Sequence, residues 1–402
     1  MSLTPLLRFS DYKLDLESRC IDDIAKVTSG GTPNRSIKEY WSGTIPWITT
    51  SQINFEDIDH AEEFITKNGL RNSSAKLFPK GTILLALYGQ GITRGRVSIL
   101  NIDATTNQAC AALILKPKAH NRFVFYFLQS KYNEIRNLSN DGGQRNLSGG
   151  LIKTISIALP QLPEQKKIAD FLTSVDRKIS QLTEKHRLLT QYKKGVMQQI
   201  FSQQLRFKDE DGSEFGAWEE FSLSQLGSFL GGGTPSTEND FFWRGDIPWI
   251  SSSDIQEDKL FTINISRYIN TSAIRNSATK VIPANSLLIV SRVGIGKFAV
   301  CNQEICTSQD FTNFTPNTSN VNFMAYLLSH NKNRLLSLGQ GTTIKGFTVS
   351  DLSSLKLEIP CLAEQQKIAL FLQAIDAKID ATNQQLEQAK LFKKGLLQQM
   401  FV

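Results

Sequence analysis

Two pairs of polar, glycine-containing stretches in this sequence carry side chains that can contact a nucleic acid. The first pair is Leu87–Ile99 ("LYGQGITRGRVSI") and Ser291–Val300 ("SRVGIGKFAV"), each following an apolar run that is predicted to be a buried strand. Glycines let a backbone approach phosphates closely, and arginine or lysine supplies charge or donors for base edges. The candidate contact residues of this pair are Tyr88, Gln90, Arg94, Arg96, Arg292 and Lys297.

The second pair of stretches is Gly142–Ser148 ("GGQRNLS") and Gly341–Thr348 ("GTTIKGFT"), in which polar side chains follow glycines. Glutamine, asparagine and arginine can make bidentate hydrogen bonds to purines. Ala104–Ala109 ("ATTNQA") and Cys306–Phe311 ("CTSQDF") lie between the two pairs and add one glutamine each, although the same residues also form turns. The candidate contact residues here are Gln108, Gln144, Arg145, Asn146, Gln309, Thr342, Thr343 and Lys345.

Each stretch by itself is more typical of a solvated surface loop than of a binding site. Recurrence at matching places in both halves of the chain makes a binding role an equal alternative. The formal net charge of +7 and the pI of about 9.0 agree with a polyanionic partner. The charge is uneven, with +5 over residues 1–160 and −3 over residues 206–360. We therefore expect polyanion binding to depend on local clusters of side chains.

The sequence has no arrangement of residues that is typical of catalysis or of a metal site. Its four histidines are far apart, and its five cysteines include no Cys-x-x-Cys pair. Val293–Phe298 ("VGIGKF") lacks the first glycine and the final Ser/Thr of a phosphate-binding Walker A motif. We expect a binding protein that directs chemistry done elsewhere; an enzyme would need a site that these patterns do not reveal. No apolar run approaches the roughly 20 residues that cross a bilayer, and we expect a cytoplasmic protein.

Nearly the whole sequence is an internal duplication, and the two copies are offset by about 200 residues. Leu162–Leu172 ("LPEQKKIADFL") matches Leu362–Leu372 ("LAEQQKIALFL"), and Ser29–Ile53 matches Gly231–Ile255 around shared Gly-Gly-Thr-Pro and Ile-Pro-Trp-Ile phrases. A unit of this length is too long for a solenoid, whose repeats are about 20–45 residues. The sequence therefore predicts two globular blocks, each followed by a helical segment, with the boundaries 1–160, 161–205, 206–360 and 361–402.

The two helical segments carry apolar residues at alternating steps of four and three, which is typical of a coiled-coil seam. Each segment is predicted to be one helix of about 37 residues, roughly 55 Å long. His186 and Lys193 interrupt the first seam, and Thr382 and Lys393 the second. The predicted seam and partner-docking residues are Ile168, Leu172, Val175, Ile179, Leu182, Leu189, Val196, Ile368, Leu372, Ile375, Ile379, Leu386 and Leu396.

Two packings of these helices are open. The helices can pair with each other, antiparallel, because the ends of a domain usually lie close together and the second helix then begins near the end of the first. Alternatively, each helix packs separately onto its own block. The blocks mix short β-branched runs with apolar-patterned helical stretches, and Trp47 and Trp249 are predicted core aromatics. The predicted fold is α+β: two pseudo-two-fold-related α/β blocks separated by a pair of long antiparallel coiled-coil helices.

Together these motifs resemble the specificity subunit of type I restriction-modification systems, over essentially the whole chain. The helical phrases resemble the openings of that family's two conserved regions, and "KKGVMQQIF" and "KKGLLQQMF" resemble their ends. "YGQGITRG" and the Gly-Gly-Thr-Pro phrases resemble framework motifs of its target-recognition domains. The resemblance implies a non-catalytic DNA sequence-specificity subunit. Each block would read one half of a bipartite, asymmetric site in double-stranded DNA, and the helices would set the spacing.

The resemblance also implies partners. Two modification (methyltransferase) subunits, which carry S-adenosylmethionine, would dock on the helices, and restriction/translocase subunits, which use ATP and Mg, would join them. No cofactor is expected in this chain, and no membrane partner. The competing hypothesis is a scaffold that binds no nucleic acid, with a coiled-coil docking rod and two protein-binding domains.

Overall fold

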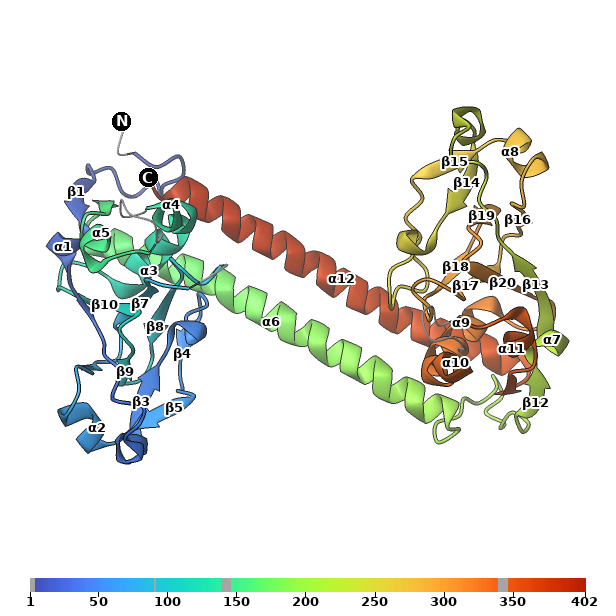
Figure 1. The fold of residues 1–402 in the computed structure, drawn as a ribbon, viewed down its shortest axis with the longest axis horizontal. Helices are drawn as coiled ribbons and strands as arrows, with labels where there is room; N and C mark the ends of the chain where they lie inside the picture. The colour runs from blue at the N-terminus through green and yellow to red at the C-terminus, as the bar shows by residue number, and fades with distance from the viewer. Residues whose placement is uncertain (1–3, 90–91, 139–145, 339–345) are drawn as a thin grey trace. The chain divides into compact units, whose positions relative to one another are not determined.

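The computed structural model describes all of the chain except residues 1–3, 90–91, 139–145 and 339–345 (Figure 1). The chain forms two compact units. Unit 1 comprises Met1–Glu184 and Asn383–Val402, and unit 2 comprises Lys185–Thr382. Each unit therefore contains one globular block, the first part of the helix that follows this block, and the end of the other long helix. Among the described residues, no helix is both long and apolar enough to cross a membrane.

The globular block of unit 1 contains eleven strands and five short α-helices among its described residues. The strands are β1 (Glu17–Cys20), β2 (Ala25–Ser29), β3 (Trp41–Ile48), β4 (Asp57–Ile58), β5 (Glu63–Ile65), β6 (Leu77–Phe78), β7 (Ile83–Ala86), β8 (Val97–Leu100), β9 (Ala104–Thr106), β10 (Cys110–Leu115) and β11 (Ser156–Leu159). The helices are α1 (Ile21–Ile24), α2 (Lys67–Arg71), α3 (Asn121–Ser130), α4 (Tyr132–Asn137) and α5 (Gly149–Lys153).

Two mixed sheets form the body of this block. The first has the strand order β2-β10-β7-β8-β4 and the second β5-β3-β9-β6, with parallel pairing of β4 to β8 and of β3 to β9. Every residue of β7 is buried, because alternate side chains of a strand point to opposite faces and each face of this sheet is covered by a core. Ile83 and Leu85 belong to the core next to the long helices, whereas Leu84 and Ala86 belong to a second core.

Unit 2 repeats this order of elements, except that its described residues include no strand equivalent to β4. Its strands are β12 (Glu219–Ser222), β13 (Gly227–Gly231), β14 (Ile247–Ile250), β15 (Arg267–Ile269), β16 (Val281–Ile282), β17 (Ser286–Val290), β18 (Phe298–Cys301), β19 (Ile305–Thr307), β20 (Phe311–Pro316) and β21 (Lys356–Ile359). Its short helices are α7 (Leu223–Leu226), α8 (Thr271–Arg275), α9 (Val321–His330), α10 (Lys332–Leu338) and α11 (Val349–Ser353). The sheets have the orders β13-β20-β17-β18 and β15-β14-β19-β16, and β14 pairs parallel to β19 as β3 pairs to β9 in unit 1. The predicted α+β class is confirmed.

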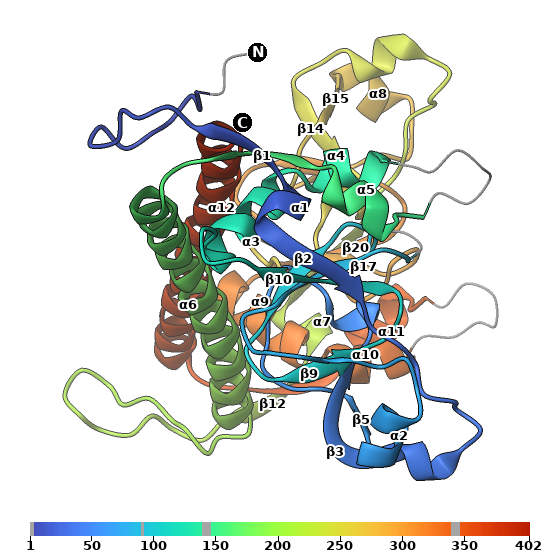
Figure 2. The same cartoon turned by 90° about the vertical axis from the view of Figure 1, so that its left-hand side faces the viewer.

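The two long helices are α6 (Leu162–Phe201) and α12 (Leu362–Met400). In unit 1, the start of α6 and the end of α12 share one core with α3, and α3 lies between them and the first sheet (Figure 2). Phe123 of α3 packs against Phe401, with 5.4 Å between ring centroids. In unit 2, Val196 and Ile200 near the end of α6 share a core with Ile368 and Leu372 near the start of α12.

The structure therefore combines the two packings that the sequence left open. Within each unit the helices pair antiparallel, and each pair also packs onto a globular block. Ten of the thirteen predicted seam residues are buried, and Ile179, Leu189 and Ile379 are half-buried. The burial of this stripe follows from its 3.5-residue spacing, which keeps one face of each helix turned toward the core.

The repeated Glu-Gln of the helix openings ties each long helix to its block. The buried Glu164 carboxylate accepts two hydrogen bonds from the Arg8 guanidinium, at 2.7 Å and 2.8 Å. The Gln165 amide nitrogen donates to the Pro160 carbonyl at 2.8 Å, and its oxygen accepts from the His120 backbone N–H at 2.8 Å. In unit 2 the same bonds join Arg206 to Glu364, and Gln365 to Pro360 and Asn320. The duplicated Glu-Gln motif thus attaches the long helix to the globular block in each unit.

The lysines that interrupt the seams make ion pairs with the opposite helix. Lys393 lies 2.6 Å from the Asp176 carboxylate, which also accepts a hydrogen bond from the Tyr126 hydroxyl at 2.7 Å. In unit 2, Lys193, Asp376 and Tyr326 form the same arrangement, with distances of 2.6 Å for both contacts.

Candidate nucleic-acid interface

Three segments that are far apart in the sequence meet at the end of β7 in unit 1. The backbone N–H of Leu87, just after β7, donates to the Ala109 carbonyl at 2.8 Å. The carbonyl of Leu87 in turn accepts from the Leu147 N–H at 3.1 Å. These bonds join three of the stretches that the sequence singled out: the one after the strand, the one containing Gln108, and the one ending in Asn146–Ser148.

Unit 2 makes the same junction at the end of β17. The Ser291 N–H donates to the Asp310 carbonyl at 2.8 Å, and the Ser291 carbonyl accepts from the Phe347 N–H at 3.1 Å. Recurrence of this pattern in both units shows that the backbone of the candidate site is part of the repeated fold. The side chains mounted on it can therefore differ without changing the framework.

The Gly-Gly-Thr-Pro turn is a fourth part of each junction. A Cβ atom on Gly30 would lie 2.1 Å from the Thr106 carbonyl oxygen, so no larger residue fits there. The Thr32 hydroxyl donates to the Gln108 side-chain oxygen at 2.5 Å, and Thr234 makes the same bond to Gln309. The sequence assigns this motif to the framework of the domains and predicts no role for its threonines. The available signal was that a threonine recurs at nearly the same distance before each glutamine.

Gln108 and Gln309 are exposed at the surface, and each is fixed through its carbonyl oxygen. The amide NH2 group is then the part of the side chain that can donate to an acceptor on a base. The threonine bond fixes the direction of this donor before any ligand arrives. Such preorganisation reduces the entropy that binding must otherwise overcome.

A cavity of about 540 Å³ opens beside the junction of unit 2. Its lining includes Gly232, Ser291, Arg292, Gln309 and Phe311. Phe311 is almost fully buried, whereas Arg292 and Gln309 are exposed. The cavity thus combines an apolar wall with a cationic and an amide donor at its rim.

Corresponding positions of the two junctions carry different side chains. Tyr88 follows the junction residue Leu87 in unit 1, and Arg292 follows Ser291 in unit 2; both Tyr88 and Arg292 are exposed. An arginine suits the two acceptors on the major-groove edge of guanine, whereas a tyrosine offers an aromatic face and a single hydroxyl. The two junction surfaces therefore offer different hydrogen-bonding groups.

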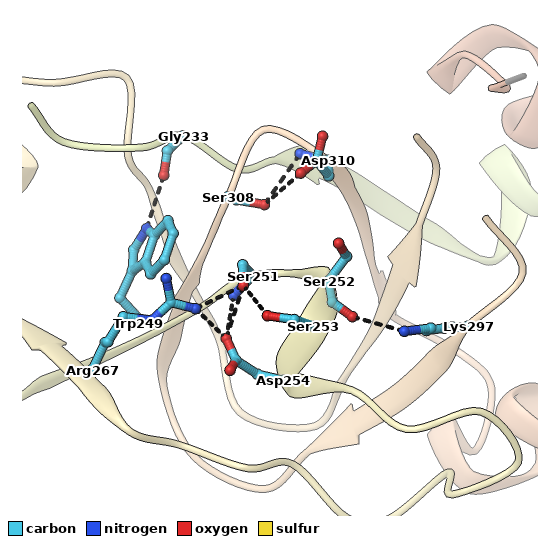
Figure 3. A network of polar contacts seen from close by, with 10 residues as sticks. All are labelled: Gly233, Trp249, Ser251, Ser252, Ser253, Asp254, Arg267, Lys297, Ser308 and Asp310. Atoms are coloured by element: carbon cyan, nitrogen blue, oxygen red, sulfur yellow. Dashed lines mark hydrogen bonds and ion pairs between the residues drawn. The ribbon is translucent and has the colours of Figure 1, made fainter. Parts of the chain in front are cut away.

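Three of the cationic side chains that were predicted to contact DNA instead contact other groups of this chain. The Arg94 guanidinium donates to the Arg136 carbonyl at 3.0 Å, and the Arg96 guanidinium lies 5.8 Å from the centre of the Phe55 ring. The Lys297 ammonium donates to the Ser252 carbonyl at 3.1 Å (Figure 3). All three side chains are half-buried. Six other predicted contacts lie outside the described residues: Gln90, Gln144, Arg145, Thr342, Thr343 and Lys345.

The tryptophans of the two Ile-Pro-Trp-Ile motifs hold the Gly-Gly-Thr-Pro turns in place. In unit 2 the Trp249 indole N–H donates to the Gly233 carbonyl at 3.0 Å, and the Arg267 guanidinium lies 4.5 Å from the centre of the Trp249 ring (Figure 3). Arg267 also binds Asp254, on the loop after β14. In unit 1 the Trp47 indole donates to the Gly31 carbonyl at 3.0 Å. Both tryptophans are buried, which confirms their prediction as core aromatics.

The described residues include no group of three or more histidine, cysteine, aspartate or glutamate side chains that could hold a metal ion. Burial raises the pKa of the Cys110 thiol, which lies close to the unit 1 junction, to about 12. This thiol therefore stays protonated near neutral pH and is a poor nucleophile. Fold and site together define a class of protein that presents one binding framework twice, with different side chains on each copy.

Comparison with known proteins identifies the family within this class. Residues 13–190 and 216–391 each match the family described as "Type I restriction modification DNA specificity domain". Because the two matches cover most of the chain, it belongs to the family of type I restriction-modification specificity subunits, with one target-recognition domain in each half.

Individual relatives of this chain are specificity subunits of the same family. The chain is 28% identical to the MjaIX specificity subunit of Methanocaldococcus jannaschii, over 95% of this chain and 92% of that protein. It is 26% identical to the EcoR124I/EcoR124II specificity subunit of Escherichia coli over 42% of this chain and 43% of the relative. The fold is similar to the solved S subunit of a type I restriction-modification system from M. genitalium, with a TM-score of 0.62, 16% identity and 99% coverage of both chains.

Proposed function

We propose that each junction reads one half of a bipartite, asymmetric DNA site. The observation that carries this proposal is that both units present the same backbone framework with different exposed side chains, Tyr88 in unit 1 and Arg292 in unit 2. A protein that recognises two different half-sites needs a constant framework with variable side chains. Phosphate contacts position such a protein on the DNA, and side chains select the bases.

Within this proposal, the exposed residues of the junctions make the base contacts. These are Tyr88, Gln108, Arg292 and Gln309, together with Asn146 next to the unit 1 junction. The candidates outside the described residues keep their proposed role as DNA contacts. Arg94, Arg96 and Lys297 contribute mainly by shaping the loops, because their charged groups contact the protein itself.

The long helices are proposed to set the distance between half-sites and to dock two methyltransferase subunits. Most of the seam residues are buried, so docking requires other residues. Tyr192 and Phe392 occupy matching positions and are 53% and 54% exposed. Each lies one turn before a glycine, Gly195 or Gly395, whose Cβ would meet nothing within 4 Å. Exposed aromatic residues beside a glycine leave room for close approach of a partner.

Catalysis is proposed to lie in the partners. The methyltransferase subunits would bring S-adenosylmethionine, and restriction/translocase subunits would bring ATP and Mg. This chain would then contribute DNA recognition and assembly only.

Methylome sequencing tests the proposal most directly. Cells that express this chain with its methyltransferase partner are expected to methylate one bipartite motif with two unlike halves and a fixed gap. Cells that express the partner with the chain deleted are expected to lose that motif. Methylation that does not depend on this chain, or a motif with a single uninterrupted half, would contradict the proposal.

Exchanging single junction side chains is expected to change one half of the motif at a time. Arg292→Ala should relax recognition at one base of the half-site read by unit 2, by about 10- to 100-fold, because a bidentate contact contributes about 1–3 kcal/mol of discrimination. Tyr88→Ala is the matched variant and should change only the other half. Binding of the reconstituted complex to a randomised duplex library measures both. Equal loss at both halves from either variant would contradict the assignment of one half to each unit.

A further inference from the structure

Unit 1 contains an open groove that plays no part in the proposed DNA site. The groove has a volume of about 750 Å³ and lies between the loop 54–59, helix α3 and the two long helices. Tyr126 of α3, Ser180 of α6 and Lys390 of α12 are among its lining residues.

Unit 2 covers the corresponding helix surface with its own side chains. The loop after Ile255 places the Lys259 ammonium in an ion pair with Asp380 of α12. Two residues later, Phe261 packs edge-to-face on Tyr326 of α9, with 5.5 Å between ring centroids. The lysine and the phenylalanine of this loop therefore cover this surface of α9 and α12.

The duplicated sequence identifies the equivalent positions in unit 1. Tyr126 corresponds to Tyr326, and Ser180 corresponds to Asp380. The unit 1 loop carries Asp57, which forms an ion pair with Arg122 of α3 instead of reaching the long helices. This loop supplies no lysine, and its aromatic residue, Phe55, packs edge-to-face on Tyr132 of α4 at 5.2 Å between ring centroids, so the groove over Tyr126 stays open.

The hydrogen-bonding groups of the groove indicate what fits it. Asp57 Oδ1 and Gln129 Oε1 are buried in its wall and have no hydrogen-bond partner within the described part of the chain. Both atoms are acceptors, so they require a donor from a ligand or solvent. Glu56 and Asp59 add exposed carboxylates at the same wall. The lining also contains four cationic side chains, of which Arg122, Lys390 and Lys393 form ion pairs with Asp57, Glu387 and Asp176. The two acceptors without a partner therefore favour a ligand that presents a hydrogen-bond donor.

We propose that this groove binds a segment of the methyltransferase partner that presents a lysine or arginine close to an aromatic side chain. The cation would bind the free oxygens of Asp57 and Gln129, and the aromatic ring would pack on Tyr126 as Phe261 packs on Tyr326. This inference rests on the proposed function, because it assigns the groove to the same partner. The inference goes beyond that function in one respect: only unit 1 makes this contact, so the two methyltransferase subunits bind this chain through different contacts.

The test is partner assembly with a variant that fills the groove. Ser180→Trp places a bulky side chain in the groove, and Lys178→Trp places the same side chain on an exposed position of α6 that does not line it. Sedimentation and native mass spectrometry of the full chain with the methyltransferase subunit report the affinity of each binding step. Ser180→Trp is expected to weaken one step at least tenfold and leave the other unchanged, whereas Lys178→Trp is expected to match the wild type.

A second variant keeps the test valid if Ser180→Trp disturbs folding. Glu56→Lys changes an exposed groove residue and adds positive charge, so it is expected to weaken the same binding step at least fivefold. Wild-type affinity for both steps in both variants would overturn the groove inference alone. A wild-type chain that binds no methyltransferase subunit would overturn the docking part of the proposed function as well. Self-association of the chain that Ser180→Trp abolishes would instead assign the groove to a second copy, and would also overturn the inference.

Discussion

Replacement of Arg8 by alanine is expected to destabilise unit 1 by about 3 kcal/mol, because it leaves the Glu164 carboxylate buried without its cation. The Arg8 and Glu164 side chains are only 16% and 3% exposed. Their two hydrogen bonds, at 2.7 Å and 2.8 Å, form the paired geometry that makes guanidinium–carboxylate contacts strong. The hydrogen bond that Arg8 donates to Glu164 is the main cause of the raised pKa of Arg8, which therefore stays charged near neutral pH.

The matched variant in unit 2, Arg206→Ala, is expected to cost less, about 2 kcal/mol, because Glu364 keeps a second donor. The Trp218 indole N–H donates to the same carboxylate at 3.2 Å, and a hydrogen bond to a charged group contributes about 1.5 kcal/mol or more. Hydrogen exchange resolved by peptide, in increasing urea, measures the stability of each unit separately. Arg8→Lys is the control and should lose less than Arg8→Ala, because it keeps the charge but not the paired hydrogen bonds.

Two outcomes would contradict this account. Equal losses from Arg8→Ala and Arg206→Ala would mean that Trp218 does not support Glu364. A loss below about 0.5 kcal/mol in unit 1 would mean that Glu164 finds water or another donor once Arg8 is removed.

The fold was predictable from the sequence where the signal is local or duplicated. The 3.5-residue spacing from Ile168 to Val196 predicted one apolar stripe, and α6 buries it, because periodicity alone determines which side chains share a face of a helix. Trp47 and Trp249 were predictable as core residues because the same Ile-Pro-Trp-Ile phrase occurs in both halves. The antiparallel direction followed from chain connectivity.

The candidate site was less predictable, because its parts meet only in three dimensions. Nothing local to Leu87 indicates that it binds both Ala109 and Leu147. Arg94 looks in the sequence like a free cation in a glycine-rich loop, yet its guanidinium donates to the Arg136 carbonyl. Whether an arginine faces solvent or a backbone carbonyl depends on which loop lies next to it, and that is set by the tertiary fold.

The lysines that interrupt the helical seams give the second large expected effect. Lys393 contacts Asp176 at 2.6 Å and lies 5.5 Å from the centre of the Tyr126 ring, and only 14% of its side chain is exposed. Burial raises the pKa of Tyr126, so its hydroxyl stays protonated and continues to donate to Asp176. A buried polar contact of this kind costs stability compared with an apolar pair but favours one register and one orientation of the helices.

Lys393→Asp is therefore expected to destabilise unit 1 by about 3–5 kcal/mol, because it replaces a partly buried ion pair by two neighbouring carboxylates. Asp176→Lys should cause a similar loss. The double variant Lys393→Asp/Asp176→Lys restores opposite charges and should recover at least about 2 kcal/mol of the summed losses, measured by urea unfolding as a double-mutant cycle. Lys390→Asp is the control on the same helix: Lys390 is 51% exposed and pairs with Glu387, so its loss should stay below about 1 kcal/mol. Additive losses in the double variant would show that Lys393 and Asp176 do not select the helix register through their charges. Recovery would show that a lysine within an apolar seam fixes how the end of one long helix meets the start of the other.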